Sequence, residues 1–179
     1  MEAGTKMLLD HLKAQGCASV GILGWQNLQK GDVFRLPKEK YLELIENANL
    51  KIPRKVFGTI HRDSVPGDEA LADFMTEWER FDAVICYSHL SALHLYTWCQ
   101  KHKINIPQDL KVAACGMRLH SELLDPPLTA FDINRERHQE EVMNFLKGQY
   151  PSEKRINMAI SPILAIHAST SSPIQERQN

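Results

Sequence analysis

The sequence predicts an α/β domain with a doubly wound parallel sheet. Short apolar runs rich in β-branched residues alternate along the chain with segments of helical periodicity. Glycines and prolines separate these segments. Alternation of this kind is typical of a parallel sheet with helices on both faces. Hydrophobic residues make up 43% of the 179 residues, which is enough for the core of one ordinary domain.

The first half of the chain is expected to supply three helices and three strands. The expected elements are a helix over 5–15, a strand over 18–24, a helix that opens at Pro37, a strand over 55–60, a helix around 71–78 and a strand over 82–87. In the third helix Leu71, Phe74, Met75 and Trp78 follow the spacing i, i+3, i+4 and i+7, which defines one buried face. The polar residues 26–32 predict a loop.

The second half continues the alternation. A helix over 89–102, a strand over 111–115, a loop over 116–125, a strand over 128–132 and a helix over 134–147 are expected. Asn134 is the expected N-cap of the last helix and Gly148 its stop. Residues 156–169 contain two strand-like pieces separated by Pro162, and the tail after 170 is polar.

Composition narrows the classes of function. The net charge is -1, so no broad attraction to nucleic-acid phosphates or to anionic membranes is expected. The longest apolar run is about six residues, whereas a membrane span needs about 20. No secretory signal is visible, and the four widely separated cysteines predict buried, reduced thiols. The expectation is therefore a cytoplasmic protein without membrane contact.

No sequence motif for catalysis, cofactors or metals is present. Phosphate-binding and dinucleotide-binding glycine patterns, the serine-hydrolase elbow and the zinc-protease motif are all absent. Cys86, His89, His94, Cys99 and His102 lie close in sequence, but their spacing matches no metal template, so they are interpreted as ordinary helix residues. His89 with Cys115 is the only candidate catalytic pair. No enzyme, cofactor or metal site is predicted.

The segment FDAVICYSHLSALHLYTWCQKHKINIPQDLKVAACG, followed by PPLT at 126–129, resembles the lactose-repressor (LacI/GalR) family of transcription regulators. The start, HLKAQGCASVGILG, is similar to the family's entry into its C-terminal subdomain. The end, ISPILAIHAST, is similar to its last crossing strand. The similarity spans nearly the whole chain, and PPLT is its sharpest motif. The resemblance implies that the doubly wound sheet is of the periplasmic-binding-protein-like type I kind.

The resemblance implies a division of the chain into two parts. Residues 1–131 with 163–179 correspond to the C-terminal effector-binding subdomain, and residues 132–162 to a remnant of the N-terminal subdomain. In the family an effector, usually a sugar or purine, binds between the lobes and shifts how N-terminal DNA-binding heads meet DNA. The head and most of the N-terminal subdomain are not in this sequence. DNA binding is therefore expected only through a missing domain.

The resemblance places the effector after the carboxyl ends of the strands, where ligands bind in such sheets. The expected effector-binding residues are Trp25, Gln26, Arg35, Ser88, His89, Gly116 and Ile133. The family's Asn-Asp pair falls on Ser88 and His89, and a family aspartate falls on Gly116. The family arginine falls on Pro37, for which Arg35 could substitute. These losses imply a changed ligand or none, and His89 is either a replacement ligand or a solvent-exposed helix-start residue.

The helix over 89–102 resembles a dimer-forming element of the family. Leu93, Tyr96, Leu123 and Leu124 are the expected contacts in a homodimer. The alternative for Leu93 is burial in the chain's own core. Three functions remain open: the ligand-sensing and dimerising core of a regulator, a sugar carrier of the same fold, and an interaction module that has lost its ligand.

Overall fold

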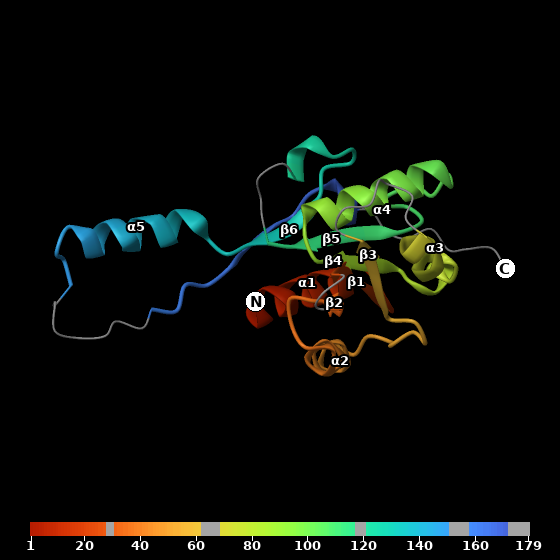
Figure 1. The fold of residues 1–179 in the computed structure, drawn as a ribbon, viewed down its shortest axis with the longest axis horizontal. Helices are drawn as coiled ribbons and strands as arrows, with labels where there is room; N and C mark the ends of the chain where they lie inside the picture. The colour runs from red at the N-terminus through yellow and green to blue at the C-terminus, as the bar shows by residue number, and fades with distance from the viewer. Residues whose placement is uncertain (28–30, 62–68, 117–120, 151–157, 172–179) are drawn as a thin grey trace.

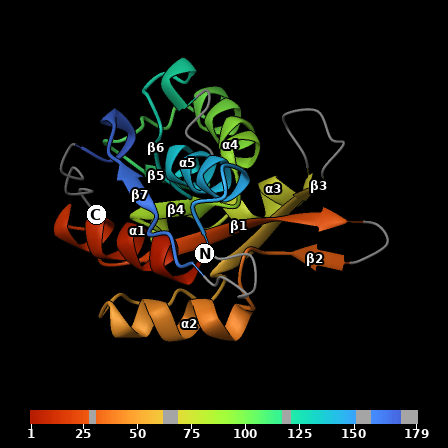
Figure 2. The ribbon, with the colours of Figure 1, turned by 90° about the vertical axis from the view of Figure 1, so that its left-hand side faces the viewer.

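One mainly parallel sheet with helices on both faces forms the centre of the molecule (Figures 1 and 2). The computed structural model describes residues 1–27, 31–61, 69–116, 121–150 and 158–171. Its strands are β1 (Val20–Asn27), β2 (Gly31–Val33), β3 (Phe57–His61), β4 (Ala83–Cys86), β5 (Lys111–Cys115), β6 (Thr129–Asp132) and β7 (Ile163–Ala165). Its α-helices are α1 (Glu2–Ala14), α2 (Lys38–Asn47), α3 (Glu69–Met75), α4 (His89–Lys101) and α5 (Arg135–Leu146). Three 3₁₀ turns are η1 (Trp78–Arg80), η2 (Ser121–Leu123) and η3 (Ala168–Thr170).

The pairing of the strands confirms the predicted fold class. β1 pairs in parallel with β3 on one edge and with β4 on the other, and β5 and β6 continue the parallel order. Every residue of β4 and β5 is buried. A strand covered on both faces needs no polar alternation, which explains the continuous apolar runs in the sequence.

Two hydrophobic clusters lie on opposite faces of this sheet. One contains Leu8, Leu9 and Leu12 of α1 with Tyr41 and Ile45 of α2. The other contains Leu71, Phe74 and Met75 of α3 with Leu95 and Trp98 of α4. Each helix therefore buries the apolar stripe that its spacing predicted.

Two pairings of the sheet are antiparallel, so the predicted parallel sheet is mainly rather than wholly parallel. β2 pairs with the end of β1, Trp25 opposite Val33, so the segment expected to be a loop contains a strand pair. β7 runs antiparallel to β6, with Leu164 opposite Phe131. Of the strand-like piece before Pro162, the described residues 158–161 form no strand. Backbone hydrogen bonds at a sheet edge can form a strand such as β2 even where the sequence has no apolar pattern.

The third helix is shorter than its apolar spacing predicted. α3 ends at Met75, and Trp78 lies in η1, half-buried against the α3/α4 cluster. The side chain of Trp78 thus reaches the same core from a separate turn. None of the helices in the described residues is long and apolar enough to cross a membrane.

Buried hydroxyl groups hydrogen-bond the segment after β7 to the sheet and to α1. Ser169 Oγ donates to the carbonyl of Val112 at 2.6 Å and accepts from the backbone N–H of Thr129 at 2.8 Å. The Thr170 hydroxyl lies 2.7 Å from that of Thr129 and 2.8 Å from His11 Nε2. These contacts join η3 to β5, β6 and α1. We call residues 1–132 with 163–171 the body.

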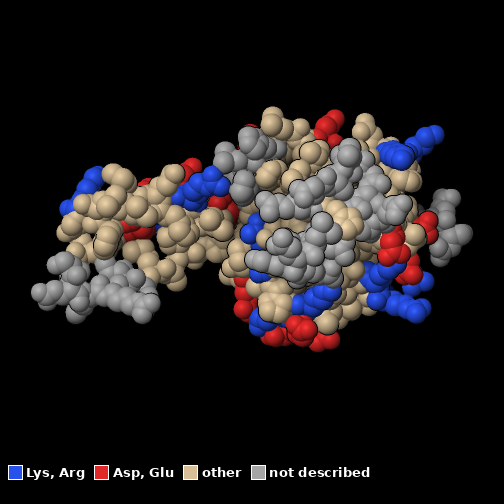
Figure 3. Space-filling model, in the orientation of Figure 1, with Lys and Arg blue, Asp and Glu red and all other residues tan. Residues whose placement is uncertain are grey.

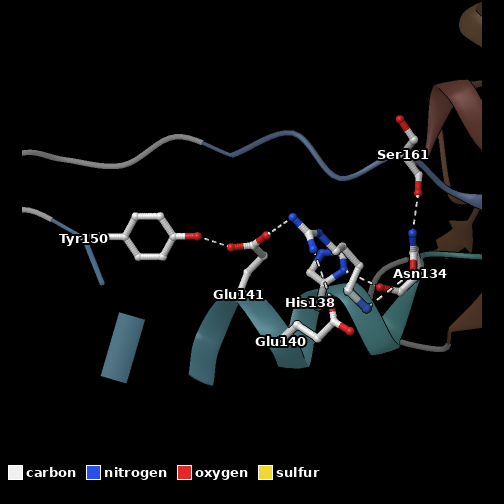
Figure 4. Close-up of polar contacts among 7 residues, drawn as sticks. Asn134, His138, Glu140, Glu141, Tyr150 and Ser161 are labelled. Atoms are coloured by element: carbon white, nitrogen blue, oxygen red, sulfur yellow. Dashed lines mark hydrogen bonds and ion pairs between the residues drawn. The ribbon is translucent and has the colours of Figure 1, made fainter. Parts of the chain in front are cut away.

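Residues 133–150 and 158–162, which we call the α5 arm, project away from the body (Figure 1). Asn134 caps α5 as predicted, because its side chain accepts from the backbone N–H of Arg137. Figure 4 shows the polar contacts inside the arm. Asn134 Nδ2 donates to the Ser161 carbonyl, and the Glu141 carboxylate accepts from the Tyr150 hydroxyl and pairs with Arg137. The arm is therefore held together mainly by local contacts.

Candidate ligand-binding site

The parallel strands β1, β3, β4, β5 and β6 end at one edge of the sheet, which we call the carboxyl edge. Trp25 lies in the last part of β1, Ser88 and His89 begin α4 after β4, and Gly116 follows β5. Arg35 approaches from the β2–α2 connection, and Ile133 follows β6. The predicted residues therefore lie at one edge of the sheet, but only some of them contact one another.

Arg35 is the residue of this set with the most defined contacts. Its Nε donates to the carbonyl of Tyr87 at 3.2 Å, and its guanidinium carbon stands 4.1 Å from the centroid of the Tyr87 ring. Its Nη2 lies 4.0 Å from the point where a Cβ on Gly116 would stand. Because Arg35 and Tyr87 are 52 residues apart, this contact joins two distant elements.

Trp25 forms the other side of the same cluster. Its ring meets the rings of Tyr87 and His94 edge-on, with centroids 6.4 and 6.2 Å away. The side chain is almost buried, so it offers little surface to a ligand. Edge-to-face packing of this kind stabilises and orients aromatic side chains.

Ser88 and His89 play a structural part at the start of α4. The Ser88 hydroxyl accepts from the backbone N–H of Ser91, and the Ser91 hydroxyl accepts from the backbone N–H of Ser88 at 2.9 Å. This capping box commits Ser88 to the helix end. His89 is the first residue of α4 and half-buried, which lies between the two expectations for it.

The other two predicted residues lie at the margins. The backbone of Gln26 belongs to β1, but its side chain is outside the described residues. Ile133 is exposed and has no described contact with Arg35 or Trp25. Beside it, Asp132 has a buried Oδ1 without a hydrogen-bond partner among the described residues.

Two residues of the cluster were not predicted. Tyr87 was assigned to the strand, yet β4 ends at Cys86, so Tyr87 is the first residue beyond it. A strand boundary one residue earlier would have found it. His94 is a buried helical residue, and no local pattern marks it.

The cysteines have the packing role that the sequence indicated. All four are buried and free. Burial raises the pKa of the Cys115 thiol to about 12, and Thr5 and Tyr41 hydrogen-bond it. A thiol with so high a pKa is a poor nucleophile, which weighs against the His89–Cys115 pair. No group of three or more His, Cys, Asp or Glu in the described part could hold a metal ion.

The predicted dimer residues line a separate hollow. Leu93, Tyr96, Leu123 and Leu124 border a groove of about 700 Å³ between α4 and η2. Leu93 is 41% exposed and Leu123 79%. Tyr96 is nearly buried, and its hydroxyl donates to the carbonyl of Pro126 at 2.9 Å. Leu93 is thus outside the core, while Tyr96 contributes little surface.

A model of the periplasmic binding protein-like domain matches residues 9–170. The chain belongs to this family. The periplasmic-binding-protein-like fold is shared with solved structures of LacI-family proteins at low identity, and the resemblance predicted from PPLT is confirmed at that level. No curated protein matches the sequence.

Three solved structures illustrate the likeness. A putative LacI-family regulator from Sanguibacter keddieii is 20% identical, with a TM-score of 0.75 over 96% of this chain and 66% of its own. A sugar-binding LacI-family regulator from Escherichia coli, complexed with phosphate, is 13% identical, with a TM-score of 0.73 over 96% and 62%. An Enterococcus faecium LacI-family regulator with bound ribose is 15% identical, with a TM-score of 0.68 over 97% and 64%. The chain therefore spans somewhat under two thirds of the length of these proteins.

Proposed function

We propose that this periplasmic-binding-protein-like domain is the ligand-sensing and dimerising core of a LacI/GalR-type transcription regulator. The observation that supports ligand binding is the meeting of Arg35, Tyr87 and Trp25 at the carboxyl edge, from three separate elements. Open α/β sheets bind ligands at this edge. Solved structures with the same fold contain D-xylulofuranose or ribose, which supports a sugar-like effector.

The proposal includes the division into two lobes. Residues 1–131 with 163–179 would be the C-terminal effector-binding subdomain, and residues 132–162 the remnant of a second lobe. The arm supports this because its exposed apolar residues, Val142, Phe145 and Leu146 among them, have no cover in the described residues. A small molecule would lie between the lobes, and DNA contact would belong to a head outside this sequence.

Ligand binding is tested by thermal unfolding and titration calorimetry against a panel of sugars, sugar acids, sugar phosphates and nucleobases. A ligand that binds only the folded state raises the melting temperature by an amount that grows with the logarithm of its concentration over Kd. We expect at least one member of the panel to do so, and Tyr87→Ala to abolish the effect. Tyr150→Phe in the arm is the matched control and should leave it unchanged.

A folded chain that responds to no member of the panel would contradict ligand sensing. It would favour the second candidate, a dimerisation or interaction module without an effector. The groove between α4 and η2 supports that candidate, because Leu123 presents a large exposed apolar side chain beside Leu93.

Dimerisation has its own test, by sedimentation velocity. Leu123→Asp should convert a dimer to a monomer, since a carboxylate cannot be buried unpaired in an apolar interface. Leu146→Asp is the control, because Leu146 is 70% exposed but lies on α5. A dimer that persists in Leu123→Asp and dissociates in Leu146→Asp would place the interface on the arm.

A further inference from the structure

The guanidinium of Arg35 is held as a fixed cation at the carboxyl edge. The Tyr87 carbonyl accepts from Nε, and the Tyr87 ring lies against the guanidinium plane. The protein itself thus occupies the Nε donor and one face of the guanidinium. The two terminal amino groups remain the part of the fork that recognises carboxylate or phosphate oxygens.

The backbone of Arg35 is fixed as well. Arg35 follows Phe34, whose ring packs edge-on against the ring of Phe57, with the centroids 5.3 Å apart. The Tyr41 ring packs edge-on against Phe34 and Phe57, with centroids 6.4 and 6.2 Å away. A cation held in this way loses little conformational entropy when it binds an anion.

Gly116 leaves the place beside the guanidinium without a side chain of its own. Its φ of +65° is a conformation that favours glycine. A Cβ at this position would come within 4.0 Å of Arg35 Nη2, in ordinary contact distance. The backbone conformation therefore favours glycine, which is the residue without a side chain that could contact the Arg35 guanidinium.

The charges around Arg35 are also suited to an anion. Arg35 and Lys38 line the same hollow of about 530 Å³, and Glu39 is the one acidic residue among its described lining residues. Among the described residues no carboxylate forms an ion pair with Arg35. Asp132, the acidic residue that ends β6, is not paired with it either.

From this arrangement we propose that the effector carries a carboxylate or phosphate group, and that Arg35 binds this group beside Gly116. The inference rests on the proposed function, because it names the ligand class of the same site. A sugar acid and a sugar phosphate both satisfy the chemistry. A neutral sugar does not need the cation.

The smallest probes of this site are inorganic phosphate and acetate, titrated at constant ionic strength against sodium chloride. Melting temperature and tryptophan fluorescence report binding, since Trp25 contacts Tyr87. We expect phosphate or acetate, or both, to raise the melting temperature. In Arg35→Gln the apparent affinity should fall at least tenfold, the loss of about 1.4 kcal/mol of binding free energy.

Two further variants keep the test decisive. Arg35→Lys retains the charge but loses the planar fork, so it should bind more weakly than the natural chain even if Arg35→Gln does not fold. Arg80→Gln is the control, because Arg80 is an exposed arginine in η1 that pairs with Glu77. It should bind both probes as the natural chain does.

The outcomes separate the two proposals. A response to phosphate alone assigns a phosphate ester, and a response to acetate alone assigns a carboxylate. No response to either probe, or an equal response in Arg35→Gln, overturns the anion inference. If neutral sugars from the panel bind equally well to the natural chain and to Arg35→Gln, the anion inference fails while ligand sensing stands.

Discussion

The body and the α5 arm of this molecule are both well-formed secondary structure, but only the body has a core. Helices α1 to α4 bury their apolar stripes against the sheet. In α5, Glu141 is the one buried residue, while Val142, Met143, Phe145 and Leu146 are exposed. Figure 3 shows residues of both charges on the arm as well as on the body. Apolar residues at helical spacing thus predict a face that could be buried, but they do not show whether another element packs against it.

The largest contrast between the two regions is expected from one substitution made in each. Phe74→Ala removes a ring that is 1% exposed and should cost about 3–5 kcal/mol of unfolding free energy. Phe145→Ala removes a ring that is 62% exposed and should change it by less than about 0.5 kcal/mol. Urea unfolding followed by circular dichroism measures both. Equal costs would show that the arm is covered in solution.

Glycine substitutions sharpen the comparison by a second mechanism. A Cβ at Gly58 would stand 2.2 Å from Phe74 Cγ, so Gly58→Ala should destabilise the body by about 1–3 kcal/mol. At Gly148 the space is open but φ is +70°, so Gly148→Ala should cost about 1 kcal/mol, confined to the end of α5. Global unfolding should report the first, and hydrogen exchange of α5 amides the second. A global loss from Gly148→Ala would contradict a separately held arm.

The pH dependence of stability tests how the chain after the arm returns to the body. Burial lowers the pKa of His11 below 6.5. As the pH falls below this value the unfolded chain takes up the proton first, so stability is full above it and is lost on acidification. His11→Gln should flatten the melting-temperature profile between about pH 7 and pH 5. An unchanged profile would mean that the His11–Thr170 contact does not set the acid sensitivity.

The smallest effect is expected from surface ion pairs. Arg137 pairs with Glu140 at 3.1 Å and with Glu141 on α5, and Lys6 pairs with Asp10 at 2.7 Å on α1. Arg137→Gln and Lys6→Gln should each cost about 0.2–0.5 kcal/mol, less at high salt. In Arg137→Gln, helicity and hydrogen exchange should change in α5, because Glu141 is the one buried residue of this helix. A loss of α5 protection in Arg137→Gln larger than that in Gly148→Ala would show that the pair of Arg137 with Glu141 is a main source of the stability of α5.

The candidate site was predicted unevenly from the sequence. Strand ends are readable, so the neighbourhood of Trp25, Ser88 and Gly116 was found. The contact between Arg35 and Tyr87 was not, because residues 52 positions apart meet only through the packing of β2, α2 and β4. Ser88, expected to bind an effector, also caps α4, and this second role becomes visible only from its contact with Ser91. The site assignments themselves remain predictions until ligand titration.

The sequence by itself determined the alternation of strands and helices, the buried β4 and β5, the cap at Asn134 and the family, because these depend on local apolar spacing and short motifs. Tertiary structure alone decided that β2 and β7 are antiparallel, that Trp78 lies outside α3, and that Arg35 is held over Tyr87. These features depend on backbone pairing and side-chain contacts between distant segments. Their free energy comes from groups that are not neighbours along the chain.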